Sequence, residues 1–108
     1  MTAASSTSPS SNIAKLFTGG QGTSFYPSFG TCGWTNSSSD YVVAMSASRY
    51  TSSACGQIVS ITANGKTHTA EVVDECPCCS TNSFEMSPAL FRYFTNKSVG
   101  TISIQWKV

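Results

Sequence analysis

The chain has 108 residues and a formal net charge of +1, from six basic and five acidic side chains. Only 10% of the residues are charged and 40% are hydrophobic, which excludes a disordered chain, since disorder combines low hydrophobicity with high net charge. The balanced charge lacks the basic surface that a phosphate backbone attracts, so we expect no nucleic-acid partner. No apolar run is long enough to cross a bilayer, so we expect no membrane partner.

The first 19 residues differ in composition from the rest of the chain. Residues 1–12 are mainly Ser, Thr, Ala and Pro, and such a segment cannot bury enough apolar surface to order itself. The stretch Gly19-Gly20-Gln21-Gly22 then interrupts any regular element. We therefore expect a flexible segment over residues 1–19 and one folded domain over residues 20–108.

The folded part has the pattern of short β-strands separated by turns. Asn64-Gly65 predicts a tight hairpin, because both central positions of such a turn require a positive φ. The last eight residues alternate between apolar and polar side chains, which indicates a half-buried strand. The expected strands cover residues 23–26, 41–45, 57–63, 66–73 and 101–108.

One short helix is expected before the last strand. Ser87 can cap its N-terminus, and Pro88 suits its first position. Leu90, Phe91 and Phe94 then fall on one face. The predicted fold is therefore mainly β with a single helix.

Five cysteines in so short a chain indicate disulfides, because small secreted domains use them to supplement a modest core, at about 2–4 kcal/mol each. The free thiol can be any of five residues and the other four pair in three ways, so the sequence leaves fifteen arrangements open. We expect no metal site, because the chain has one histidine and two of the cysteines are isolated. A redox CxxC motif should open a helix, whereas loop-forming residues follow the cysteine cluster.

The cysteines also indicate the compartment, which we expect to be extracellular. Asn36 and Asn96 each begin a glycosylation acceptor pattern, in agreement with export. The N-terminus shows no signal-peptide pattern, so we expect Met1 to replace a removed leader. We expect a monomer without a cofactor.

Several motifs stand in a fixed order along the chain. They are Gly22-Thr23-Ser24-Phe25-Tyr26, Thr31-Cys32-Gly33, Asp40-Tyr41-Val42-Val43-Ala44, Cys55-Gly56, Val72-Val73-Asp74-Glu75-Cys76-Pro77, Met86-Ser87-Pro88-Ala89-Leu90-Phe91 and Ile104-Gln105-Trp106. With this order the chain resembles the double-psi β-barrel family, which includes rare lipoprotein A-like domains, the first domain of expansins, fungal loosenins and barwin-like proteins. The resemblance covers about residues 20–108. It implies a closed six-stranded barrel with a groove across one face and one short helix before the last strand.

The resemblance also implies which cysteines form disulfides. In the fungal single-domain members, four cysteines occupy positions like Cys32, Cys55, Cys76 and Cys79. Cys78 stands where those relatives usually have glycine, so it is the expected odd thiol. The pairing among the other four stays open.

Asp74 is the main candidate for a functional site. It closes an apolar strand and precedes a Cys-Pro loop, so we expect its carboxylate at the edge of the groove. In similar expansins and in small inverting endoglucanases of this fold, the matching aspartate is the acid on which wall loosening or glycosidic protonation depends. The alternative is a structural role in which the carboxylate caps backbone N–H groups of a loop.

The catalytic set looks incomplete, so an enzyme is not the favoured interpretation. Inverting hydrolysis needs two carboxylates about 6.5–9.5 Å apart, and the segment Phe25-Tyr26-Pro27-Ser28, where related endoglucanases carry the base, has no acid. Glu71 should point away from Asp74 in a regular strand, and Glu85 is assigned to capping near the helix start. His68 would lie roughly 20 Å from Asp74 along the same strand. A single groove acid is therefore expected.

What remains is binding of a neutral polymer. Aromatic faces and neutral hydroxyls suit uncharged sugars, because rings pack on the C–H surface while hydroxyls exchange hydrogen bonds. Ser24 and Tyr26 match positions that expansins use beside the acid, and Trp34 and Tyr50 lie in or beside loops. Core packing is the alternative role for each aromatic residue.

Three functions are compatible with these features. The first is a secreted expansin- or loosenin-like protein that binds and loosens cell-wall polysaccharide, cellulose or chitin, without hydrolysis, through a groove centred on Asp74. The second is a secreted inhibitor of cysteine proteases on the same barrel. The third is residual inverting hydrolysis of a β-glycan, which requires a second carboxylate near Asp74.

Overall fold

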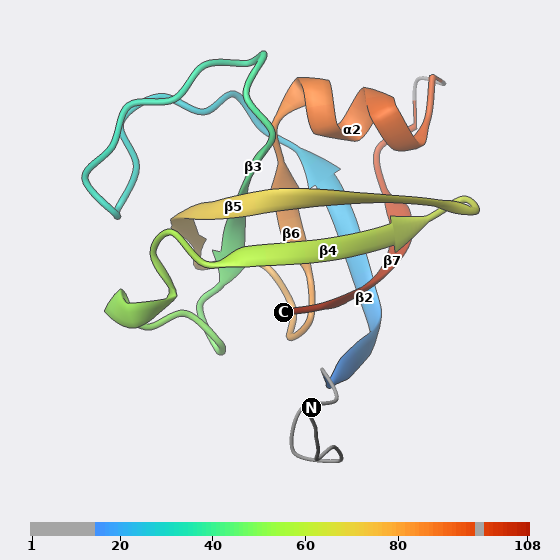
Figure 1. Ribbon diagram of the computed structural model, residues 1–108, viewed down its shortest axis with the longest axis horizontal. Coiled ribbons are helices and arrows are strands. Elements are labelled where there is room, and N and C mark those ends of the chain that lie inside the picture. The colour runs from blue at the N-terminus through green and yellow to red at the C-terminus, as the bar shows by residue number, and fades with distance from the viewer. Residues whose placement is uncertain (1–14, 97–98) are drawn as a thin grey trace, which may run out of the picture.

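The computed structural model describes residues 15–96 and 99–108, and within them six strands close into a barrel in the order β2-β6-β3-β5-β4-β7 (Figure 1). This confirms the predicted mainly β fold with one helix before the last strand. The elements are β2 (Leu16–Ser24), β3 (Val42–Ser46), the 3-10 helix η1 (Ser52–Ala54), β4 (Ile58–Ala63), β5 (Lys66–Cys76), β6 (Phe84–Met86), α2 (Pro88–Phe94) and β7 (Ile102–Lys107).

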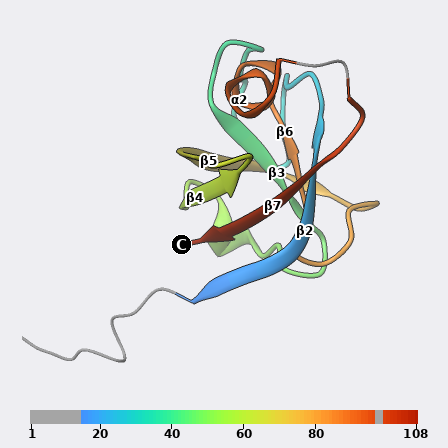
Figure 2. The same cartoon turned by 90° about the vertical axis from the view of Figure 1, so that its right-hand side faces the viewer.

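The first described strand, β2, starts earlier and ends earlier than the sequence suggested. It runs from Leu16 through the expected boundary at residues 19–20, and it pairs antiparallel with β7 (Figure 2). Phe17 explains this extension, because its ring stacks on that of Trp106 at 4.3 Å between centroids. Gly20 and Gly22 do not break β2 but let it pass close to its neighbours, and the strand stops at Ser24, before the predicted end at residue 26.

The core fills the barrel and extends under α2, which lies across one end of it (Figure 1). The alternation of β7 is as predicted, because Ile102, Ile104 and Trp106 are buried while their neighbours are exposed. The helix contributes one apolar face through its buried residues. These are Pro88, Leu90, Phe91 and Phe94.

Local turn chemistry follows the sequence in one place and departs from it in another. Asn64 and Gly65 both have positive φ, as the hairpin between β4 and β5 requires. Ser87 occupies the N-cap position of α2 but makes no side-chain cap. Its hydroxyl donates instead to the carbonyl of Asp40 at 2.5 Å and accepts the N–H of Val42, so it fastens β3 to the helix start. No helix in the described part of the chain is long and apolar enough to cross a membrane.

Two disulfides link four of the five cysteines. Cys32 is bonded to Cys55 and Cys76 to Cys79, which leaves Cys78 as an exposed free thiol. The bridged residues are the four that the family resemblance implied, and the geometry supplies the pairing that the sequence left open.

Asn82 ties the loop between β5 and β6 to the barrel wall. Its side-chain amide donates to the carbonyl of Thr18 at 2.9 Å, and its own carbonyl accepts the indole N–H of Trp106 at 3.0 Å. A Cβ on Gly20 would overlap this same carbonyl oxygen. The close approach of β2 to the loop therefore requires glycine at position 20.

We predict that Gly20→Ala lowers the free energy of unfolding by roughly 1–3 kcal/mol, because the backbone of Asn82 must move to admit the methyl group. Gly100→Ala is the matched control, since a Cβ there has nothing within 4 Å. Urea titrations of the two variants and the unmodified chain measure the effect. Equal unfolding midpoints for both variants would refute the steric argument.

Candidate functional site

A β-bulge in β5 turns Asp74 to the outside of the barrel. Val43 on β3 pairs with Val72, whereas the next residue, Ala44, pairs with Asp74, so Val73 is an extra residue in β5. Val72 points into the core, and in a regular strand Asp74 would point the same way. The bulge therefore exposes a carboxylate that simple alternation would bury.

The same bulge overturns the expectation that Glu71 and Asp74 lie on opposite faces. Val42 pairs with Glu71 and Ala44 pairs with Asp74. Since Val42 and Ala44 are two residues apart on β3, they share a face, and so do their partners. Both carboxylates are thus on the outer side of β5.

Glu85 lies on the other flank of Ala44. Ala44 on β3 pairs with Asp74 on one side and with Glu85 of β6 on the other, and Glu85 pairs in turn with Thr23 of β2. Neighbouring strands are about 4.8 Å apart, which separates the Cα atoms of the two acids by roughly 10 Å. Thr23, Glu85, Ala44 and Asp74 form a row across four strands, here named the Asp74 face.

Asp74 also fastens the long loop between β2 and β3 to the barrel. Its Oδ1 accepts hydrogen bonds from the backbone N–H of Thr31 at 2.8 Å, the hydroxyl of Thr31 at 2.6 Å and the N–H of Glu75 at 2.8 Å. The N–H of Cys32 donates to the carbonyl of Val73 in the bulge. The capping alternative is therefore realised, and Asp74 remains partly exposed.

The two acids have pKa values displaced in opposite directions. Partial burial of Asp74 opposes its ionisation, but the hydrogen bonds from Thr31 and Glu75 outweigh this and lower its pKa. Partial burial, and secondly the negative charge of Asp74, raise the pKa of Glu85. Asp74 thus ionises first, and Glu85 titrates in its field.

The expectation of a single acid on this face needs correction, because Ala44 pairs with Asp74 on one side and with Glu85 on the other. Its assigned capping role is also wrong: Glu85 lies within β6, and the first turn of α2 holds no acidic residue. The sequence offered one signal of a strand at Glu85, which lies between the apolar residues Phe84 and Met86. Three residues are too few for that pattern to stand out.

The loop between β2 and β3, which extends from the barrel at the left of Figure 1, carries exposed aromatic side chains. Tyr26 is 82% exposed, Phe29 72% and Trp34 43%. The disulfide Cys32–Cys55 and the contact of Thr31 with Asp74 hold this loop at the edge of β5. Tyr26 and Trp34 are therefore available for binding, and Phe29 is an addition that the sequence did not single out.

Ser24 and Tyr50 have different surroundings: Ser24 is exposed at the end of β2, whereas Tyr50 is partly buried. Ser24 pairs with Met86, on the opposite side of β2 from Thr23, so Thr23 rather than Ser24 lies in the row with the acids. Tyr50 packs against the core, and its hydroxyl is 3.4 Å from the sulfur of Cys55. Tyr50 therefore supports the disulfide-linked loops rather than offering a ring to a ligand.

The glycosylation candidates have different surroundings. The side-chain nitrogen of Asn36 donates to Asp40 at 3.4 Å, and its Oδ1 is buried without a partner in the described residues. Asn96 is exposed, but the rest of its acceptor pattern, residues 97 and 98, lies outside the described residues. Asn96 is thus the more accessible acceptor.

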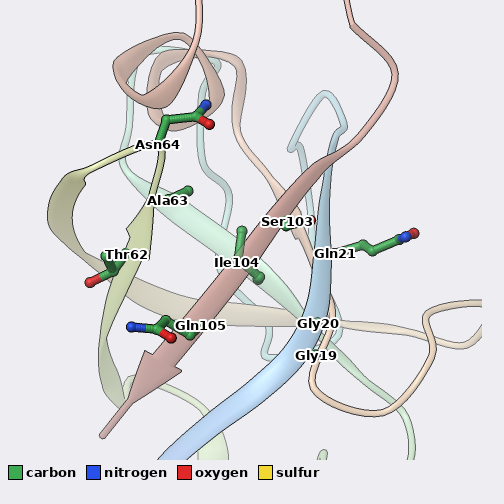
Figure 3. Close-up of a pocket in the computed structure, with 9 residues that line it drawn as sticks. All are labelled: Gly19, Gly20, Gln21, Thr62, Ala63, Asn64, Ser103, Ile104 and Gln105. Carbon is green, nitrogen blue, oxygen red and sulfur yellow. The ribbon is translucent and has the colours of Figure 1, made fainter.

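The barrel surface has one cavity away from the Asp74 face and another that borders it. One of about 440 Å³ opens where β4 and β7 diverge and is lined only by uncharged residues, with Gln21, Asn64 and Gln105 around it (Figure 3). Another of about 240 Å³ borders the Asp74 face at Thr23 and Glu85. Cys76, Cys78 and Glu85 place ligand atoms within 4.8 Å of one another, but the disulfide occupies the sulfur of Cys76.

Comparisons with known proteins give one relative by sequence and several by structure. Allergen Asp f 7 of Aspergillus fumigatus is 41% identical over 73 residues, which is 67% of this chain and 27% of that protein. No family model matches the chain. The Streptomyces papain inhibitor superposes with a TM-score of 0.77 at 27% identity, over 86% of this chain and 93% of the inhibitor.

Expansin of Clavibacter michiganensis has the same fold. The apo protein gives a TM-score of 0.76 at 23% identity, and a variant in complex with cellohexaose gives 0.77 at 24%. These matches cover 89% and 87% of this chain and half of the expansin. This chain thus spans about a quarter of the allergen and half of the expansin, but nearly all of the inhibitor. Its closed six-stranded barrel has the double-psi β-barrel fold of these solved structures.

We predict that Thr31→Val lowers the free energy of unfolding at pH 7 by on the order of 0.5–1 kcal/mol, because an exposed carboxylate loses one donor. The lowered pKa of Asp74 means that its ionised form stabilises the fold above the unfolded-state pKa, and that this stabilisation is lost as the pH falls through the folded-state pKa. The difference between variant and unmodified chain should therefore shrink at pH 2.

Thr31→Ser, which keeps the hydroxyl, is the control and should match the unmodified chain at both pH values. Denaturant titrations at the two pH values provide the measurement. A loss of stability in Thr31→Val that is the same at pH 7 and pH 2 would assign the effect to packing rather than to the carboxylate.

Proposed function

We propose that this chain is a secreted expansin- or loosenin-like protein that binds neutral cell-wall polysaccharide, cellulose or chitin, and loosens it without hydrolysis. The observation that carries the proposal is the group of exposed rings of Tyr26, Phe29 and Trp34 on a loop fastened to an ionised Asp74. The cellohexaose complex of the similar expansin variant supports the class of ligand.

Aromatic rings, a carboxylate oxygen and a hydroxyl would each make a different contact with the sugar. Flat rings pack against the C–H faces of glucose or N-acetylglucosamine units. Oδ1 of Asp74 is committed to Thr31 and Glu75, whereas Oδ2 has no hydrogen bond within the described residues, so it can accept a sugar hydroxyl. Thr23 adds a neutral hydroxyl in the same row.

The displaced pKa values support binding rather than cleavage by Asp74. A general acid must carry its proton at the working pH, and the lowered pKa of Asp74 makes it a poor proton donor. Asp74 is therefore assigned a hydrogen-bonding role. Glu85 has the raised pKa and is the better proton donor of the two, so the hydrolytic alternative would have to run through Glu85.

We predict that Tyr26→Ala and Trp34→Ala each weaken retention on insoluble cellulose or chitin roughly five- to thirty-fold, the loss expected for an aromatic contact of about 1–2 kcal/mol. Tyr93→Ala on α2, an exposed aromatic outside the loop, is the control and should bind normally. Pull-down isotherms measure retention, and reducing-sugar release from the same samples detects cleavage. Unchanged retention in both loop variants would reject the proposed binding surface, and sugar release abolished by Glu85→Gln would replace loosening with hydrolysis.

The second candidate function, inhibition of papain-like cysteine proteases, is favoured by one observation. The chain spans 93% of the Streptomyces papain inhibitor but only half of the expansin. A protease would contact exposed loops, so the same aromatic loop is available to it. Residual papain activity at a molar excess of the chain decides between the two candidates, since a polysaccharide-binding protein should leave the protease fully active.

A further inference from the structure

Three cysteines meet where β5 ends, and they are not chemically equivalent. Cys76 and Cys79 form a disulfide, and Cys78 between them is an exposed free thiol. The sulfur of Cys78 lies 3.8 Å from the sulfur of Cys76. This is close to the contact distance of two sulfur atoms, so the free thiol already lies against the disulfide.

We propose that Cys78 is a thiol–disulfide exchange site, at which the free thiol of the oxidised chain moves between positions 78 and 79. Cys78 loses its proton, and the thiolate attacks the sulfur of Cys76. The bond from Cys76 to Cys78 forms as the bond from Cys76 to Cys79 breaks, and Cys79 leaves as a thiolate that takes up a proton. No net oxidation or reduction occurs, so the exchange needs no external oxidant or reductant.

Backbone geometry directs the attack to Cys76 rather than to Cys79. Disulfide-bonded residues usually have Cα atoms about 4.4–6.8 Å apart, and the Cα atoms of Cys76 and Cys79 are 5.4 Å apart. Neighbouring residues such as Cys78 and Cys79 are held at about 3.8 Å by the peptide bond, below that range. Cys76 is therefore the shared partner, and Cys78 and Cys79 compete for it.

The exchange site adjoins the Asp74 face. Cys78, Cys79 and Glu85 line the same cavity of about 240 Å³, and the carbonyl of Cys79 accepts the hydroxyl of Ser46 at 3.2 Å. Moving the bond to Cys78 changes the anchor of the loop over residues 77–83 while leaving β5 intact. The loop therefore has two covalent forms, each presenting a different thiol for modification.

Disulfide mapping of the oxidised chain tests the proposal. The chain is held at mildly alkaline pH, where thiolate is formed, then alkylated with iodoacetamide and sequenced by tandem mass spectrometry without reduction. We expect two populations, one alkylated at Cys78 and one at Cys79 with Cys76 bonded to Cys78. Alkylation at Cys78 alone, at every incubation time, would overturn the proposal.

Two variants provide an independent count of free thiols. Cys78→Ser is the control and should contain none, since Cys76 and Cys79 remain bonded. Cys79→Ser should also contain none, because Cys78 then bonds to Cys76. Two free thiols in folded Cys79→Ser would show that Cys78 cannot reach Cys76 and would overturn the proposal. If Cys79→Ser does not fold, the mapping of the unmodified chain decides alone.

Discussion

The bulge at Val73 is the constraint on which the candidate site depends. It shifts the register of β5 by one residue, so that Asp74 leaves the inward-facing side and stands beside Ala44 on the outer surface. The carbonyl of Val73 accepts the N–H of Cys32, and a Cβ on Gly30 would lie 2.6 Å from that carbonyl oxygen. The bulge therefore fixes both the position of the acid and the path of the aromatic loop.

The loop between β2 and β3 is held by a few hydrogen bonds and a disulfide rather than by a large apolar core. Oδ1 of Asp74 accepts hydrogen bonds from the backbone N–H and the hydroxyl of Thr31. The disulfide Cys32–Cys55 joins the loop to the segment around η1. Tyr50 supports this disulfide from the core side. Such fastening keeps exposed rings in place without burying them, which suits a surface that contacts an extended ligand.

Much of the fold followed from the sequence, because its signals are local. The hairpin at Asn64-Gly65, the alternation of β7 and the apolar face of α2 depend on residues close together in the chain. The three-residue strand β6 and the start of β2 could not be predicted in this way, because pairing with distant strands creates them. Gly20 and Gly22, which the sequence predicts as part of a chain break, are points of close approach between β2 and its neighbours.

The candidate site was predictable only in part. Asp74 could be singled out, but its outward direction depends on a bulge that alternation cannot reveal. The sequence assigns Glu85 to capping because it lies just before Ser87. Its partners in the sheet, Ala44 and Thr23, are more than 40 and more than 60 residues away in the chain, so no local pattern reveals them. The cysteine pairing likewise depends on which loops the barrel brings together.

Electrostatic coupling between Asp74 and Glu85 is the most direct test of their shared outer face. Carboxyl carbon chemical shifts followed by NMR as a function of pH measure it, in the unmodified chain and in Asp74→Asn. We expect Asp74 to titrate below its ordinary range and Glu85 above it, and we expect the midpoint of Glu85 to fall when Asp74 is neutralised. A midpoint of Glu85 that is the same in both proteins would contradict the shared outer face.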